Sequence, residues 1–195
     1  ILRTEYDLYC QLSSGNLMGQ NDKKYFRENE GFFWKDMTLQ NKGYTYDYFS
    51  PMILTDSEVS FDGTIQPDGP GYQALIIYQD ILPLASAEQI LEWARDGGLP
   101  VVFVNHATEN TRKRSFTSNG LIEVTYDQAA SRTPYDDGND ERLEAVISEL
   151  KSLPSVRVVD NASKAYDALM SLGVYPRTEF TEPNANIITY TRETD

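Results

Sequence analysis

The stretch "ALIIYQDILPLASAEQILEWARDGGLPVVFVN", residues 74–105, decides the fold because it predicts a strand, a helix and a second strand in succession. Its two ends, residues 74–78 and 101–104, are continuous apolar runs, which are typical of strands covered on both faces. Between them, the spacing of Ser86 and Gln89 indicates a capping box that opens a helix, and a pair of glycines indicates its end. Two buried strands joined by a helix form a parallel βαβ unit, so we expect a parallel sheet.

The same alternation continues toward the carboxyl end of the chain. Residues 139–153 carry apolar side chains at helical spacing behind a capping Asn139 or Asp140, which predicts an amphipathic helix. Residues 156–159 ("VRVV") predict another strand, and residues 161–173 predict a further helix that a glycine closes. Strands and helices in this order place helices on both faces of one sheet. We therefore predict an α/β fold, doubly wound with a mostly parallel sheet and flavodoxin-like in outline.

Other segments show weaker strand and loop patterns. Residues 5–9 and 186–191 predict a first and a last strand, and the alternating aromatic residues of 43–49 predict a strand with one covered face. Residues 121–126 indicate a short strand or a flap. The basic cluster "TRKR" at 111–114 is interpreted as a solvated turn.

The length of 195 residues suits one α/β domain. We expect residues 1–195 to form a single domain, with residues 1–42 as an arm or as its first β-α unit. Because the sequence begins almost directly on a predicted strand and has no initial methionine, we expect it to be part of a larger protein. The residues leave the compartment open between secreted and cytoplasmic.

The net charge of −13 disfavours two classes of partner. Nucleic acids and anionic membranes are both bound through basic surfaces, so we expect neither. No window of the sequence approaches the ~18 consecutive apolar residues of a membrane-spanning helix. Cys10 is the only cysteine, which excludes an intrachain disulfide and a metal site built from cysteines.

Polar side chains follow three of the predicted strands, at the edge where ligands bind in doubly wound sheets. They include Asp80, Asn105 and Asp160. His106, the only histidine, is a candidate catalytic base that Glu109 or Asp80 would orient. The chain contains no G-x-S-x-G or G-x-C-x-G elbow to supply a nucleophile. We therefore favour a histidine that is hydrogen-bonded in a loop over a catalytic one.

The motifs predict neither a cofactor nor a metal. The phosphate-binding patterns G-x-G-x-x-G and G-x-x-x-x-G-K-[ST] are absent, so nucleotide binding has no support. The acid-rich "YDDGND" at 135–140 is similar to the start of a calcium loop but lacks the downstream ligand spacing, and we favour a capped helix start with solvated acids. Asn161 and Ser163 form a glycosylation sequon, which we interpret as part of a helix cap.

Aromatic residues are the remaining candidates for binding. Trp34, Tyr44, Tyr46 and Tyr48 could stack on sugar rings, since aromatic faces suit the apolar side of a pyranose. The alternative, which we favour, is that these side chains pack in the core or against a neighbouring domain.

Several stretches occur in an order that resembles a known family. They are "GYTYDYFSPMIL" (43–54), "DGTIQPDGPGYQALIIYQDILPLASAEQILEWARDGGLPVVFVN" (62–105), "RTPYDDGNDERLEAVISEL" (132–150), "ALMSLGVYPRTEF" (168–180) and "NIITYTRETD" (186–195). Together they resemble the region that follows the catalytic barrel in large α-L-rhamnosidase-like enzymes of glycoside hydrolase family 106 and its relatives.

The resemblance implies an accessory domain similar to class I glutamine amidotransferases and to the trimerisation domain of some β-galactosidases. True amidotransferases carry a cysteine on the elbow after a central strand, whereas Asn105 and His106 follow residues 101–104 here. The catalytic carboxylates of the rhamnosidase-like family lie in the barrel, so the resemblance assigns no catalytic residue to this chain.

Three functions stay open. The first is a non-catalytic accessory domain of a glycoside hydrolase, whose partners are the other domains of the parent enzyme or further copies of the chain. The second is a stand-alone hydrolase or lyase that uses His106 with Asp80 and Glu109. The third is a carbohydrate-binding module that uses the aromatic residues, and we rank it last because doubly wound sheets seldom serve as such modules.

Overall fold

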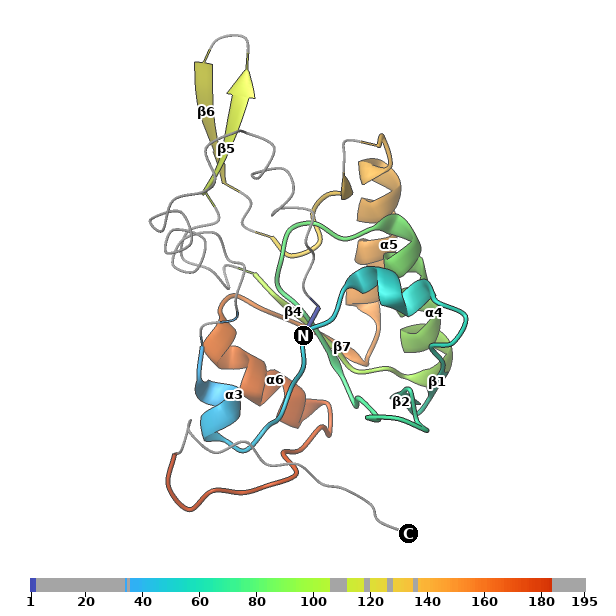
Figure 1. Ribbon diagram of the computed structural model, residues 1–195, viewed down its shortest axis with the longest axis vertical. Helices are drawn as coiled ribbons and strands as arrows, with labels where there is room; N and C mark the ends of the chain where they lie inside the picture. Colours follow the sequence, from blue (N-terminus) through green and yellow to red (C-terminus); the bar gives the residue numbers. More distant parts are fainter. Residues whose placement is uncertain are drawn as a thin grey trace.

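The computed structural model describes residues 1–2, 34, 36–105, 128–134 and 137–183, together with the backbone of 112–117 and 120–125. Its centre is a parallel sheet in the order β3 (Leu75–Ile77), β4 (Val101–Val104) and β7 (Val156–Val159) (Figure 1). The register places Leu75 opposite Val101 and Val101 opposite Val156. The predicted strand–helix–strand unit is therefore confirmed, with each apolar run forming a strand.

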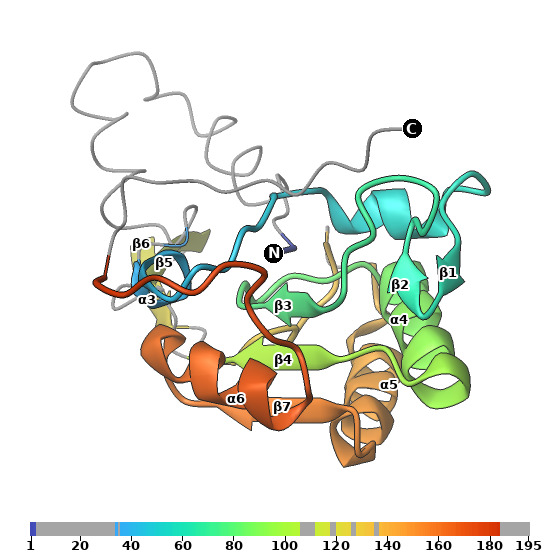
Figure 2. The ribbon, with the colours of Figure 1, turned by 90° about the horizontal axis from the view of Figure 1, so that it is seen from below.

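Helices cover both faces of this sheet (Figure 2). One face packs against α4 (Leu84–Gly97) and α5 (Asp140–Ser152), and the other against α6 (Ala165–Ser171) with α3 (Thr38–Asn41) beside it. A parallel sheet covered in this way confirms the mixed α/β fold that the sequence predicts.

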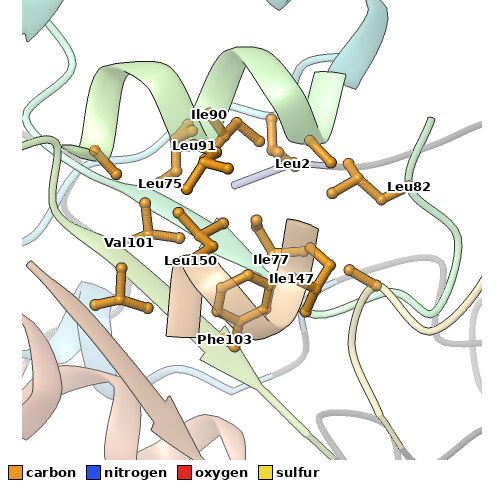
Figure 3. Packing of buried hydrophobic residues seen from close by; sticks show 14 of the residues in the cluster. Leu2, Leu75, Ile77, Leu82, Ile90, Leu91, Val101, Phe103, Ile147 and Leu150 are labelled. Atoms are coloured by element: carbon orange, nitrogen blue, oxygen red, sulfur yellow. The ribbon is translucent and has the colours of Figure 1, made fainter. Parts of the chain in front are cut away.

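The two faces are supplied by alternate residues of the same strands. The cluster in Figure 3 contains Leu75, Ile77, Val101 and Phe103 together with Ile90, Leu91, Ile147 and Leu150 from the two helices. The intervening residues Ile76, Tyr78, Val102 and Val104 belong to the second cluster, with Leu169 of α6. Because successive side chains of a strand point to opposite faces, three short strands serve two separate cores.

Short elements complete the described part of the chain. They are the 3-10 helices η1 (Pro51–Thr55) and η3 (Ala162–Lys164), the hairpin of β1 (Phe61–Asp62) and β2 (Thr64–Ile65), and the ribbon of β5 (Arg112–Thr117) and β6 (Gly120–Thr125). The β5–β6 ribbon projects away from the two clusters (Figure 1). It corrects the prediction of a solvated turn at 111–114, because Arg112 to Arg114 pair with residues 123–125 of β6. Among the described residues, no helix is both long and apolar enough to cross a bilayer.

The aromatic segment 43–49 differs from its prediction. Within this described segment the chain forms no strand, and Phe49 joins Leu2 only through an isolated parallel bridge. Tyr44, Tyr46 and Tyr48 pack against the second cluster. An alternating pattern reports the burial of one face and carries no information about backbone pairing, which explains the error.

The predicted start of the helix between β3 and β4 is wrong, and its predicted end is right. Helix α4 begins at Leu84 behind Pro83, so Ser86 lies inside the helix, and its buried hydroxyl donates to the Pro51 carbonyl at 2.9 Å. The predicted capping box is therefore wrong, because a buried hydroxyl is satisfied by the nearest acceptor in space. The predicted end of this helix is confirmed, since Gly98 takes the left-handed conformation at its C-cap. The predicted strands at 5–9 and 186–191 lie outside the described residues.

Gly43 fixes the approach of two segments that lie far apart in the sequence. It has a φ of +85°, and a Cβ built there would lie 1.7 Å from the carbonyl oxygen of Thr178. Gly98 also has a positive φ, of +71°, but no described atom lies within 4 Å of its Cβ position. The first glycine is thus required by both conformation and space, and the second by conformation alone.

We expect Gly43→Ala to lower the free energy of unfolding by about 3 kcal/mol, because the methyl group forces the backbone around Thr178 to move. Gly98→Ala is the matched control and is expected to cost about 1 kcal/mol. Urea unfolding of the two variants measures both values. Equal losses would contradict the close contact between Gly43 and Thr178.

Candidate functional site

The carboxyl edge of the sheet is the first candidate site, because ligands bind there in doubly wound proteins. Asp80 follows β3 and is 4% exposed. Its Oδ2 accepts a hydrogen bond from Nε of Arg132 at 2.8 Å, in an ion pair whose arginine side chain is 25% exposed. A buried carboxylate of this kind needs a partner charge, and Arg132 supplies it.

Residues 128–134 lie across this edge and are held by backbone and side-chain groups of the strand ends. The backbone N–H of Ser131 and that of Arg132 donate to the Asp80 carbonyl at 2.7 and 3.1 Å. The Ala129 N–H donates to Oδ1 of Asn105 at 3.0 Å. The polar groups that the sequence marks at two strand ends therefore hold a covering segment in place.

The third strand end, after β7, forms a helix cap. Oδ1 of Asn161 accepts from the backbone N–H of Lys164 at 3.3 Å and from the Ser163 hydroxyl at 2.7 Å. Asp160 forms an exposed ion pair with Lys164 at 2.7 Å. The interpretation of Asn161 and Ser163 as part of a helix cap is confirmed.

The candidate catalytic group of His106, Glu109 and Asp80 is placed only in part. His106 and Glu109 lie outside the described residues. Asp80 is described, and its carboxylate faces Arg132. The catalytic group therefore stays a hypothesis. Asp80, the one of its three residues that is described, has a structural role.

The acidic stretch before α5 is also used by the fold. Asp140 accepts from both the backbone N–H and the hydroxyl of Thr133, at 2.6 and 2.7 Å, and Asp137 lies 2.6 Å from the same hydroxyl. Hydrogen bonds from Thr133 and Asn139 hold the pKa of the Asp137 carboxyl below its usual value. The prediction of solvated acids holds in part, because both side chains are exposed but also accept hydrogen bonds from Thr133. Among the described residues, no three His, Cys, Asp or Glu side chains are placed to share a metal ion.

The four aromatic candidates separate into two groups. Trp34 is 6% exposed and packs edge-on against Tyr78, with ring centroids 5.6 Å apart, and its backbone N–H donates to the Tyr48 hydroxyl at 3.0 Å. Trp34 is a member of the second cluster, and Tyr48 packs against it from the border. Tyr44 and Tyr46 also pack against this cluster, and in addition they line a cavity.

This cavity has a volume of about 290 Å³ and lies at the opposite end of the sheet from Asp80. Gln73 and Ala74, which lead into β3, and Val174, which follows α6, form part of its wall. Its aromatic and charged lining residues are Tyr44, Tyr46, Asp47, Phe49, Tyr72, Tyr175 and Arg177. Sequence reasoning missed Asp47, Tyr72 and Arg177, because only the tertiary structure brings these three positions together.

The cavity wall is fixed by specific contacts. The Tyr72 hydroxyl donates to Oδ2 of Asp47 at 3.0 Å, and the Tyr72 ring stacks on Phe49 at 5.6 Å. The Tyr44 hydroxyl donates to the Val174 carbonyl at 2.6 Å. Burial, with Tyr166 nearby, raises the pKa of Tyr44 to about 12, and burial with the Asp47 hydrogen bond raises that of Tyr72 to about 12. Both phenols are therefore hydrogen-bond donors at neutral pH.

We expect Asp80→Asn to lower the free energy of unfolding by about 2 to 3 kcal/mol, because it leaves the partly buried Arg132 without its counter-charge. Asp160→Asn is the matched control at another strand end, where the ion pair is exposed and a loss below about 0.5 kcal/mol is expected. Chemical denaturation of both variants gives the comparison. A loss for Asp80→Asn no larger than the control would show that the ion pair does not hold the covering segment.

The raised pKa values of Tyr44 and Tyr72 predict a loss of stability in alkali. The folded state holds both phenolic protons more tightly than the unfolded state, so their contribution is complete below pH 10 and is lost as the pH rises from 10 to 12. Denaturation midpoints measured between pH 9 and 12 test this. The decline should be shallower in Tyr72→Phe, and an unchanged decline would contradict the assignment.

The chain was compared with models of protein families, with curated proteins and with solved structures, and nothing matches in any of the three comparisons. The resemblance to rhamnosidase-like enzymes therefore stays a prediction.

Proposed function

We propose that this chain is a non-catalytic α/β domain that accompanies the catalytic barrel of an α-L-rhamnosidase-like glycoside hydrolase. The observation that carries the proposal is the covered carboxyl edge of the sheet. Asp80 faces Arg132, and Asn105 accepts from the backbone of residue 129, so the described polar groups at the usual ligand edge bind the protein itself. A carboxyl edge that binds its own chain supports a structural role for this domain.

The alternative, a stand-alone hydrolase with His106 as base, requires a free carboxylate to orient the histidine. A carboxylate that orients a catalytic histidine accepts its ring N–H and stabilises the imidazolium. Asp80 is instead neutralised by a guanidinium and accepts its Nε–H. This arrangement counts against Asp80 as the orienting carboxylate, and Glu109, the other carboxylate named for that role, lies outside the described residues.

The order of the parallel contacts supports a flavodoxin-like sheet for this domain. Leu2 bridges Phe49 on one side and Ile77 of β3 on the other, both in parallel orientation. Taken in space, the order is Phe49, Leu2, β3, β4 and β7. Extending the isolated bridges of Leu2 and Phe49 into a first and a second strand would give the order 2-1-3-4-5 of flavodoxin-like sheets, which is the arrangement that we propose.

The test compares the isolated chain with the protein that contains it in cells. Antibodies raised against the chain should precipitate a polypeptide several times longer than 195 residues, and the precipitate should hydrolyse an aryl α-L-rhamnoside. The isolated chain should release no phenol from the same substrate.

Two results would overturn the proposal. One is a precipitated polypeptide of the size of the chain alone, without glycosidase activity. The other is hydrolysis by the isolated chain that disappears in His106→Ala and persists in a control such as Asp62→Asn, which changes an exposed residue of β1. The second result would establish the stand-alone hydrolase.

A further inference from the structure

We infer that the cavity at the amino end of the sheet binds one neutral sugar residue, and that it does so apart from any catalytic barrel. We name this cavity, lined by Tyr44, Tyr46, Asp47, Tyr72 and Arg177 among others, the tyrosine cavity. The inference goes beyond the proposed function, since an accessory domain need not bind a ligand of its own.

The size of the tyrosine cavity limits the ligand. Its volume of about 290 Å³ lies just below the range for pockets that bind drug-sized molecules, which is roughly 300 to 1,000 Å³. Such a space suits a single sugar ring and is too small for an enclosed oligosaccharide. A longer chain would place one residue in the cavity and the rest outside it.

The charged groups of the lining indicate a ligand with both donors and acceptors. Asp47 offers carboxylate oxygens as acceptors, and Arg177 offers guanidinium N–H donors. Arg177 forms no ion pair with any described residue, whereas Tyr72 already donates to one oxygen of Asp47. A hydroxyl group can donate to the carboxylate and accept from the guanidinium, so a polyol matches the pair.

The rest of the lining suits the ring of a sugar. Tyr44, Tyr46 and Tyr72 supply aromatic surface, and Ala74 and Ile76 supply aliphatic surface. Aromatic side chains with a polar tip bind ligands that are apolar on one side and polar on the other. A pyranose has C–H groups on its faces and hydroxyl groups around its edge, which fits this lining.

A zwitterionic ligand such as a free amino acid is the competing class, because it would carry its own ammonium for Asp47 and carboxylate for Arg177. Both side chains are exposed in the described structure. Attraction between exposed charges is weak in water and is screened by salt. The hydrogen-bonding capacity of the two groups therefore matters more than their charge, which favours the neutral polyol.

The experiment uses the 195-residue chain and saturation-transfer NMR with L-rhamnose, D-galactose and D-glucose, with L-serine as the zwitterionic probe. We expect saturable binding of at least one sugar with a dissociation constant of about 1 mM, as a ligand of this size allows. Asp47→Asn and Arg177→Gln should each weaken that binding about tenfold, since each removes a hydrogen bond to a charged group.

Asp62→Asn is the matched control for Asp47→Asn, because Asp62 is an exposed aspartate of β1 outside the cavity, and it should bind the sugar as the unchanged chain does. The inference is overturned if no sugar binds saturably, if the two cavity variants bind it unchanged, or if L-serine binds more tightly than every sugar. A cavity that binds no sugar leaves the proposed accessory domain standing, because the immunoprecipitation test is independent of this cavity.

Discussion

The structure depends on the complete burial of two short parallel strands, β3 and β4, on both of their faces. Leu75, Val101, Val102, Phe103 and Val104 have essentially no exposed surface. Each large apolar side chain in such a position contributes about 1.5 to 3 kcal/mol relative to its exposed state. A sheet of this kind cannot exist alone in water, so α4 and α5 on one face and α6 on the other are conditions of its stability.

The same burial determines what happens at the ends of the strands. Residues that leave the covered strands β3 and β4 carry their polar groups into a partly buried region, where each group needs a partner. Asp80 pairs with Arg132, and Asn105 binds the backbone of residue 129. The segment that lies across the carboxyl edge thus stabilises it, and it covers the Asp80 carboxylate.

The tyrosine cavity lies at the other end of the sheet, where the surrounding segments leave a space open. It forms where residues 44–49, the turn before β3 and the segment after α6 meet without filling the space between them. Gly43 permits this arrangement, because its backbone approaches the Thr178 carbonyl more closely than any side chain would allow. Among the described residues, the carboxyl edge is occupied by protein groups, whereas the tyrosine cavity at the other end of the sheet is open.

The sequence by itself determined the strands at 74–78, 101–104 and 156–159, the helices between and after them, and the mixed α/β class. Long apolar runs and helical periodicity report burial directly, and glycine at a helix end reports a positive φ, so these features are local. The tertiary structure alone decided the start of α4, the pairing of Asp80 with Arg132 and the meeting of Asp47, Tyr72 and Arg177. Each of these features joins residues that are 25 or more positions apart in the sequence. No local sequence pattern encodes which distant groups will meet.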